Sequence, residues 1–128
     1  MTAQQEYFMA VKAKLQGLGY DVYDSALPPV GTPYPFIYLV ETTDTLINAK
    51  MQEAGYIRLI FQVWGKATQR GTISDISGKA REAIRTLSRT DHYGYNLNEY
   101  EQRILNDNTT KQPLMQSYNS LRVFYSRR

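Results

Sequence analysis

The sequence contains no cysteine, so disulfide bonds and thiolate metal sites are excluded. No stretch approaches the ~18 apolar residues that a membrane-spanning helix needs. The first residues, 1–6, lack the basic start and the apolar run of a secretory signal. We therefore expect a protein that is made and kept in the cytoplasm, or in a particle assembled there.

Residue patterns that carry chemistry are also scarce. The single histidine, His92, has no second histidine or cysteine partner, which favours a surface histidine in a turn over a catalytic base or a metal ligand. Gly65 and Gly71 lack the lysine and serine of a phosphate-binding loop, and no serine lies in a GxSxG motif. We expect no enzymatic activity, no metal and no cofactor, and an enzyme working through His92 is the weakest alternative.

The composition is that of an ordinary globular protein. Its 128 residues are 42% hydrophobic and 21% charged, which predicts one folded domain over residues 1–128. A net charge of +3 permits contact with nucleic acid but does not require it. The 11 tyrosines have two explanations, because tyrosine fills small sheet cores and is also enriched at protein interfaces.

Helical periodicity occurs twice. Behind a possible N-cap at Thr2, apolar residues recur at helical spacing: Phe8, Val11, Leu15 and Leu18. A second helix is expected over 72–87, with Thr72 and Asp75 as a capping box. The apolar face of this second helix consists of Ile73, Ile76, Ala80, Ala83, Ile84 and Leu87.

Five segments have strand character, and they are residues 20–23, 36–42, 56–65, 100–105 and 118–125. A proline-rich loop is expected at 24–35, and a long polar loop at 43–55. Because the strands gather together and the helices fall outside a regular alternation, the predicted fold class is α+β. The expected order is α-β-β-β-α-β-β, with two helices packed on a mainly antiparallel sheet of four to five strands.

The two strongest strands carry apolar residues on both faces. In 56–65 the residues that face the core alternate with residues on a second face, which include Ile60 and Trp64. In 36–42 the second face includes Tyr38. One explanation is that the second face is covered by a neighbouring subunit. The other is that the two helices cover one sheet face each.

Arginines recur at four-residue spacing on the polar side of the second helix. Arg81, Arg85 and Arg89 could face phosphates, line a DNA-conducting channel or meet an acidic neighbour. A solvated helix face is the favoured explanation, because acidic side chains lie nearby to balance the arginines.

Together these segments resemble a known family. The residues that carry the resemblance are Val-Tyr-Asp at 22–24, Tyr-Pro-Phe-Ile at 34–37, Gln-Val-Trp at 62–64 and the amphipathic helix that follows. This pattern, which covers about residues 8–87, resembles the tail-completion or tail-terminator (head–tail joining) proteins of long-tailed bacteriophages of the siphovirus type.

The resemblance implies a structural protein of the virion. It implies a ring, expected to be a hexamer, that caps the tail tube at its head-proximal end and joins the tail to the DNA-filled head after assembly in the host cytoplasm. The implied partners are further copies of the chain, the tail tube protein, the head-completion protein of the connector, and DNA that passes through without sequence recognition; no membrane is involved.

The candidate subunit interface consists of Tyr38, Leu46, Ile47, Met51, Ile60 and Trp64. The alternative function is a small nucleic-acid-binding module that uses the basic helix 72–89.

Overall fold

The structure is a computed structural model that describes residues 1–47, 52–109 and 111–128. In chain order its elements are α1 (Ala3–Gly17), β1 (Val22–Tyr23), β2 (Phe36–Ile47), β3 (Ala54–Lys66), the 3-10 turn η1 (Ala67–Gln69), α2 (Arg70–Arg85), β4 (Tyr93–Asp107) and β5 (Leu114–Arg127). This confirms the predicted fold class and the predicted element order.

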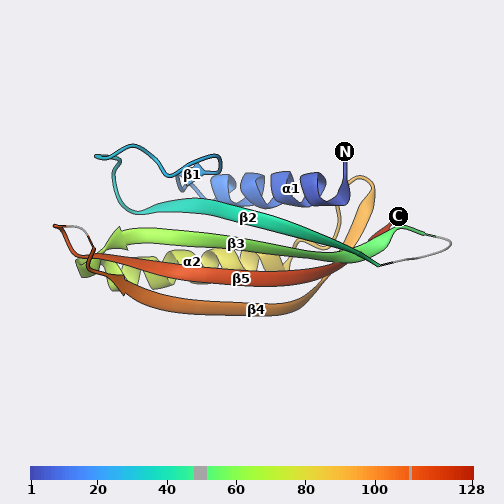
Figure 1. Ribbon diagram of the computed structural model, residues 1–128. Helices are drawn as coiled ribbons and strands as arrows, with labels where there is room; N and C mark the ends of the chain where they lie inside the picture. The colour runs from blue at the N-terminus through green and yellow to red at the C-terminus, as the bar shows by residue number, and fades with distance from the viewer. Residues whose placement is uncertain (48–51, 110) are drawn as a thin grey trace.

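The strands form a single sheet in the order β1-β2-β3-β5-β4. The short β1 pairs in parallel with the start of β2, and every other neighbouring pair is antiparallel. Strands β2 to β5 run nearly the full length of the molecule, as Figure 1 shows. The sheet is therefore long, narrow and strongly twisted.

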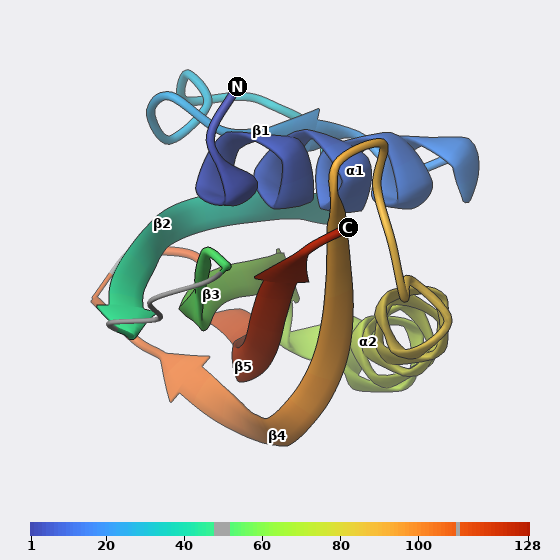
Figure 2. The same ribbon diagram turned by 90° about the vertical axis from the view of Figure 1, so that its right-hand side faces the viewer.

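Both helices pack on the same face of this twisted sheet, with α1 over β2 and α2 over β3 and β5 (Figures 1 and 2). One continuous core joins them to the sheet, and its fully buried side chains include Tyr7, Val11, Leu15, Ile37, Leu39, Ile57, Leu59, Phe61, Val63, Ile73, Leu121 and Tyr125. The explanation in which each helix covers its own sheet face is thus wrong. No helix formed by the described residues covers the opposite face, and we call it the open face.

The first helix begins where the sequence predicts. The Thr2 hydroxyl accepts a hydrogen bond from the backbone N–H of Gln5 at 3.1 Å, and the Gln5 side chain accepts one from the Thr2 backbone at 2.9 Å. The predicted apolar stripe is only half right, because Leu18 is 39% exposed and Phe8 is only partly buried. Ala3 and Tyr7 take their places, since the helix presents a strict four-residue row, Ala3, Tyr7, Val11 and Leu15, to the sheet.

The second helix begins earlier than predicted. Its N-cap is Gln69 and its first residue is Arg70, so the expected capping box of Thr72 and Asp75 is wrong. The turn η1 sets this start, because the Gln69 side chain accepts the backbone N–H of Lys66 at 2.8 Å. The predicted buried face is confirmed at its centre, where Ile73, Ile76, Ala80 and Ile84 are buried.

The prediction of a long polar loop at 43–55 is also wrong. β2 continues to Ile47 and β3 already begins at Ala54. Alternating threonines and Asp44 extend β2 beyond the part of the sheet that the helices cover, so these strand residues are exposed and polar. The Tyr125 hydroxyl donates to the Asp44 carboxylate at 2.9 Å and holds this extension to β5.

The last two strands are longer than predicted. β4 includes 93–107 without a break, because a bulge between Leu97 and Glu99 accommodates one extra residue in the ladder with β5. β5 extends from Leu114 to Arg127, with Leu121, Val123 and Tyr125 buried on the core face as expected.

Candidate assembly surface

The open face lies on the alternate residues of the central strands. Along β3 every second residue is fully buried, while Ile60 and Trp64 point the other way and are half-buried. Tyr38 lies on the same face of β2, where its Cα partner is Gln62. The structure therefore places Tyr38, Ile60 and Trp64 on one face, which neither helix covers among the described residues.

A groove lies beside Trp64, where β3 reaches its C-terminal end. It has a volume of about 660 Å³ and lies between the proline-rich loop and the turn before β5, with Leu27, Val30, Tyr34, Phe36, Trp64 and Leu114 among its lining residues. The Trp64 indole N–H donates to Gln62 Oε1 at 2.9 Å. Val30 is fully exposed and Leu27 is 58% exposed, so the rim of the groove presents apolar side chains to solvent.

The other candidate interface residues lie at the far end of β2. Leu46 is 66% exposed and Ile47 is 39% exposed, although each belongs to a paired strand and not to a loop. The sixth candidate, Met51, lies outside the described residues. Leu46 pairs with the core-facing Gly55 and Ile47 with Ala54, so the two side chains point to opposite faces of the sheet.

Sequence reasoning missed two arginines at the centre of the open face. Arg58 of β3 and Arg122 of β5 are direct cross-strand partners, an arrangement in which like charges repel. Arg58 is neutralised by Glu99 at 2.7 Å, which lowers the pKa of that carboxyl group, and it also donates to Ser120 at 2.8 Å. Arg122 lies over the Tyr56 ring, 4.6 Å from its centroid.

Arg122 lies directly across from Glu99 of β4 and helps to lower its pKa, but among the described residues it forms no ion pair of its own, and its Nε is buried without a hydrogen bond. The two arginines and Tyr56 line a hollow of about 210 Å³ together with Thr43 and Thr45 of β2. We call this the arginine hollow. The signal that could have revealed it was the alternation of Arg58 with buried residues in β3, which places its side chain on the same face as Ile60 and Trp64.

The outer edges of the sheet are largely unpaired. β1 pairs with β2 only at Ile37 and Tyr38. At the β4 edge, the chain before β4 pairs with the start of that strand, where the backbone N–H of Tyr95 donates to the backbone carbonyl of Ser88 at 2.8 Å. Among the described residues no strand pairs with the remainder of either edge, so two long backbone edges face solvent.

The three predicted arginines do not form one continuous row. Arg85 is paired with Glu82 at 3.2 Å, and Arg81 lies 5.6 Å from the centroid of the Tyr100 ring. Arg89 lies beyond the end of α2, in an isolated bridge with Gly94. All three are exposed, but they lie on the helix side of the molecule and not on the open face.

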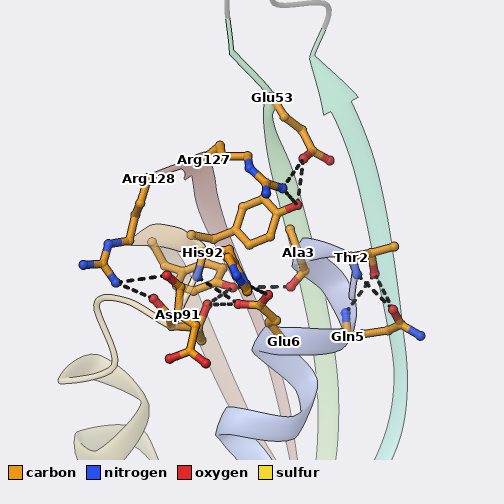
Figure 3. Close-up of polar contacts among 12 residues, drawn as sticks. Thr2, Ala3, Gln5, Glu6, Glu53, Asp91, His92, Arg127 and Arg128 are labelled. Atoms are coloured by element: carbon orange, nitrogen blue, oxygen red, sulfur yellow. Dashed lines mark hydrogen bonds and ion pairs between the residues drawn. The ribbon is translucent and has the colours of Figure 1, made fainter.

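His92 lies in the turn before β4 and contacts a buried carboxylate (Figure 3). Its Nδ1 is 2.7 Å from Glu6 Oε2, and its backbone N–H donates to Glu6 Oε1 at 3.2 Å. The Thr90 hydroxyl donates to the same carboxylate at 2.7 Å. The bond from Thr90, with those from His92, holds the pKa of Glu6 at about 2. Each contact joins α1 to the chain before β4, which is a structural role.

Two further properties limit the kinds of site present. Among the residues described, no group of three or more histidine, aspartate and glutamate side chains converges as a metal site would. No helix within the described ranges has both the length and the apolar character to cross a membrane.

Comparison with known proteins gives one informative result. No protein-family model matches the sequence, and no curated protein sequence matches it. Among solved structures, a chain of the "Virion of native gene transfer agent (GTA) particle" superposes with a TM-score of 0.55 at 16% sequence identity. The superposition covers 95% of this chain and 94% of that chain, so the two share the fold over nearly their whole lengths.

Proposed function

We propose that this chain is a structural protein of a bacteriophage or phage-like virion. The observation that supports this most directly is the fold shared with a chain of the gene transfer agent particle over 95% of the present chain. The open sheet face and the unpaired edges fit a protein that works by contact with neighbouring subunits.

Within the virion, we propose that the chain caps the tail tube and joins the tail to the DNA-filled head. A ring of copies, six in number by the family resemblance, would surround the axis along which DNA passes. Such a ring needs two different surfaces on each copy, because head-to-tail contacts are heterologous. The open face with Tyr38, Ile60 and Trp64 and the exposed end of β2 with Leu46 and Ile47 supply candidate surfaces, as does Met51 by its place in the sequence.

The predicted arginines Arg81, Arg85 and Arg89 belong to this proposal as a contact for DNA in the channel or for an acidic neighbour. Arg85 is the residue to test, because it is 63% exposed and its partner Glu82 is equally exposed. If Arg85→Glu leaves head–tail joining intact, Arg85 has no part in that contact. We do not advance the nucleic-acid-binding module as a second function, because Arg81 and Arg85 already have partners within the chain.

Electron microscopy of particles made without this gene tests the proposed function. Separate DNA-filled heads and unjoined tails are expected, and supplying the wild-type gene in trans should restore joined particles. Normal joined particles in the absence of the gene would reject the proposal.

A further inference from the structure

We propose that copies of this chain join edge to edge, with the free part of β4 in one copy pairing antiparallel with the free part of β2 in the next. This inference rests on the proposed virion assembly and names the contact that builds it. Each copy would use two different edges, so that successive additions close a ring or extend a filament.

The free parts of both edges are long enough to pair with another strand. Among the described residues, none pairs with the outer edge of β2 over 39–47, because β1 pairs only with the preceding residues Ile37 and Tyr38. In the described part of the chain, nothing pairs with the outer edge of β4 over 96–107, because the chain before β4 pairs only with its first residues. Edges of this length are rarely left open in monomers, since they offer a row of unsatisfied backbone groups to other chains.

The strand directions allow the pairing. Each of the contacts β2 with β3, β3 with β5 and β5 with β4 is antiparallel, so β2 and β4 run in opposite directions within one copy. When a second copy is placed beside the first with its open face on the same side, its β4 lies antiparallel to the first copy's β2. The alternation of directions then continues across the boundary between the two copies.

Side-chain charges select the register. On the open face the free edges carry Glu41, Thr43 and Thr45 on β2 and Glu99, Glu101 and Arg103 on β4. A register that sets Arg103 against Glu41 of the next copy brings opposite charges together. Shifting the register by two residues in one direction sets Glu101 against Glu41, where like charges repel. Shifting it by two residues in the other direction sets Arg103 against Thr43, so that Arg103 has no carboxylate opposite it.

The same register accounts for the arginine hollow. With Arg103 opposite Glu41, Glu101 lies opposite Thr43 and Glu99 lies opposite Thr45. Both threonines line the arginine hollow, where the two arginines share one nearby carboxylate, Glu99, which is ion-paired with Arg58. Glu101 is 70% exposed and lies 3.6 Å from Arg103 of its own copy. In the proposed register the second copy's Glu101 therefore brings a second carboxylate to the edge of a hollow that holds two arginines.

Disulfide trapping tests this register directly, because the chain has no native cysteine. In the variant carrying Thr43→Cys and Glu101→Cys, the two thiols lie on opposite edges of one copy, separated by three strand spacings or about 14 Å. A disulfide cannot bridge that distance, so any bond must join two copies. Mild oxidation at millimolar protein concentration should give a ladder of covalent oligomers on a non-reducing gel.

The matched control carries Thr45→Cys and Leu105→Cys, which lie on the same two strands and the same face but six residues out of the proposed register. We expect no ladder from this control. Equal ladders from both variants, or none from the first, would overturn the inference. A register-specific ladder from a chain whose loss leaves joined particles normal would instead support the pairing and reject the proposed function.

Charge reversal gives an independent measurement that a folding defect cannot imitate. Glu41→Arg and Arg103→Glu should each weaken self-association of the full chain by roughly two- to five-fold in sedimentation equilibrium. The two substitutions combined should restore it, because the pair is re-formed with its charges exchanged. Additive loss in the double variant would show that these residues do not face each other.

Discussion

The Nδ1 atom of His92 lies 2.7 Å from Oε2 of Glu6, so that a turn late in the chain is fastened to the first helix (Figure 3). Glu6 is 9% exposed and also accepts hydrogen bonds from Thr90 and from the His92 backbone. A carboxylate held by several donors is stabilised in its charged form. The contact therefore links the stability of the protein to pH.

The direction of this dependence follows from the pKa of Glu6, which is about 2 in the folded protein and 4.5 ordinarily. The stabilisation is fully present above pH 4.5 and is lost as the pH falls towards 2. We expect Glu6→Gln to remove this part of the acid sensitivity and to lower the free energy of unfolding near neutral pH. Urea denaturation at several pH values measures both effects.

Glu82→Gln is the matched control for Glu6. Arg85 lowers the pKa of Glu82, but both side chains are exposed on α2 and screened by solvent. Its pH profile should follow the wild type closely. A Glu6→Gln variant that kept the wild-type loss of stability between pH 4.5 and 2 would show that this carboxylate does not contribute.

Gly55 occupies a position where a larger residue does not fit. A Cβ atom there would lie 2.4 Å from the Thr45 carbonyl oxygen and 2.8 Å from Cε2 of Tyr125. We expect Gly55→Ala to destabilise the fold by about 1–3 kcal/mol, because the backbone of the β2–β3 pair must shift. Gly78 lies within α2 with no atom near its missing Cβ, so Gly78→Ala should stabilise by about 0.5–1 kcal/mol. Chemical denaturation of both variants checks the contrast.

The sequence allows the core of this fold to be predicted, because its periodicity is strong. Alternation in β3 identifies Ile57, Leu59, Phe61 and Val63 as buried, and all four are fully buried. Prediction failed where polar strand residues lie beyond the cover of the helices. The β2 extension around Asp44 has the composition of a loop, yet pairing with β3 makes it a strand.

The candidate surface was predicted less completely than the fold. Ile60 and Trp64 were placed correctly on the second face of β3, since strand alternation fixes that geometry. The pairing of Arg58 with Arg122 was not predictable, because it depends on the order β3-β5-β4, which brings distant segments together. The free edges could not be predicted for the same reason.

Two buried tyrosine hydroxyls differ in their partners and should respond differently to removal. The Tyr7 hydroxyl is buried without a hydrogen-bond partner in the described part of the chain, whereas the Tyr125 hydroxyl donates to Asp44 at 2.9 Å. Burial raises the pKa of both phenols. Tyr7→Phe should leave the stability unchanged or increase it, and Tyr125→Phe should lower it by about 0.5–1.5 kcal/mol. Equal losses in thermal or urea denaturation would contradict this assignment of partners.

Trp64 is the residue of the open face whose loss should separate folding from assembly. Its side chain is half-buried beside an open groove on the face of β3 opposite to the core, so Trp64→Ala should keep the far-ultraviolet circular dichroism spectrum of the wild type. If Trp64 is an anchor in a subunit contact, its truncation should cost about 2 kcal/mol or more, which is roughly a 30-fold loss in affinity.

Counting joined particles in trans-complementation with the Trp64→Ala variant measures this effect on assembly. Met9→Ala is the control, because Met9 is 55% exposed on α1, away from the open face. The control should support joining at the wild-type level, while Trp64→Ala should leave most heads and tails separate. Wild-type joining by a folded Trp64→Ala protein would remove this tryptophan from the contact and leave the unpaired strand edges as the remaining surface for assembly.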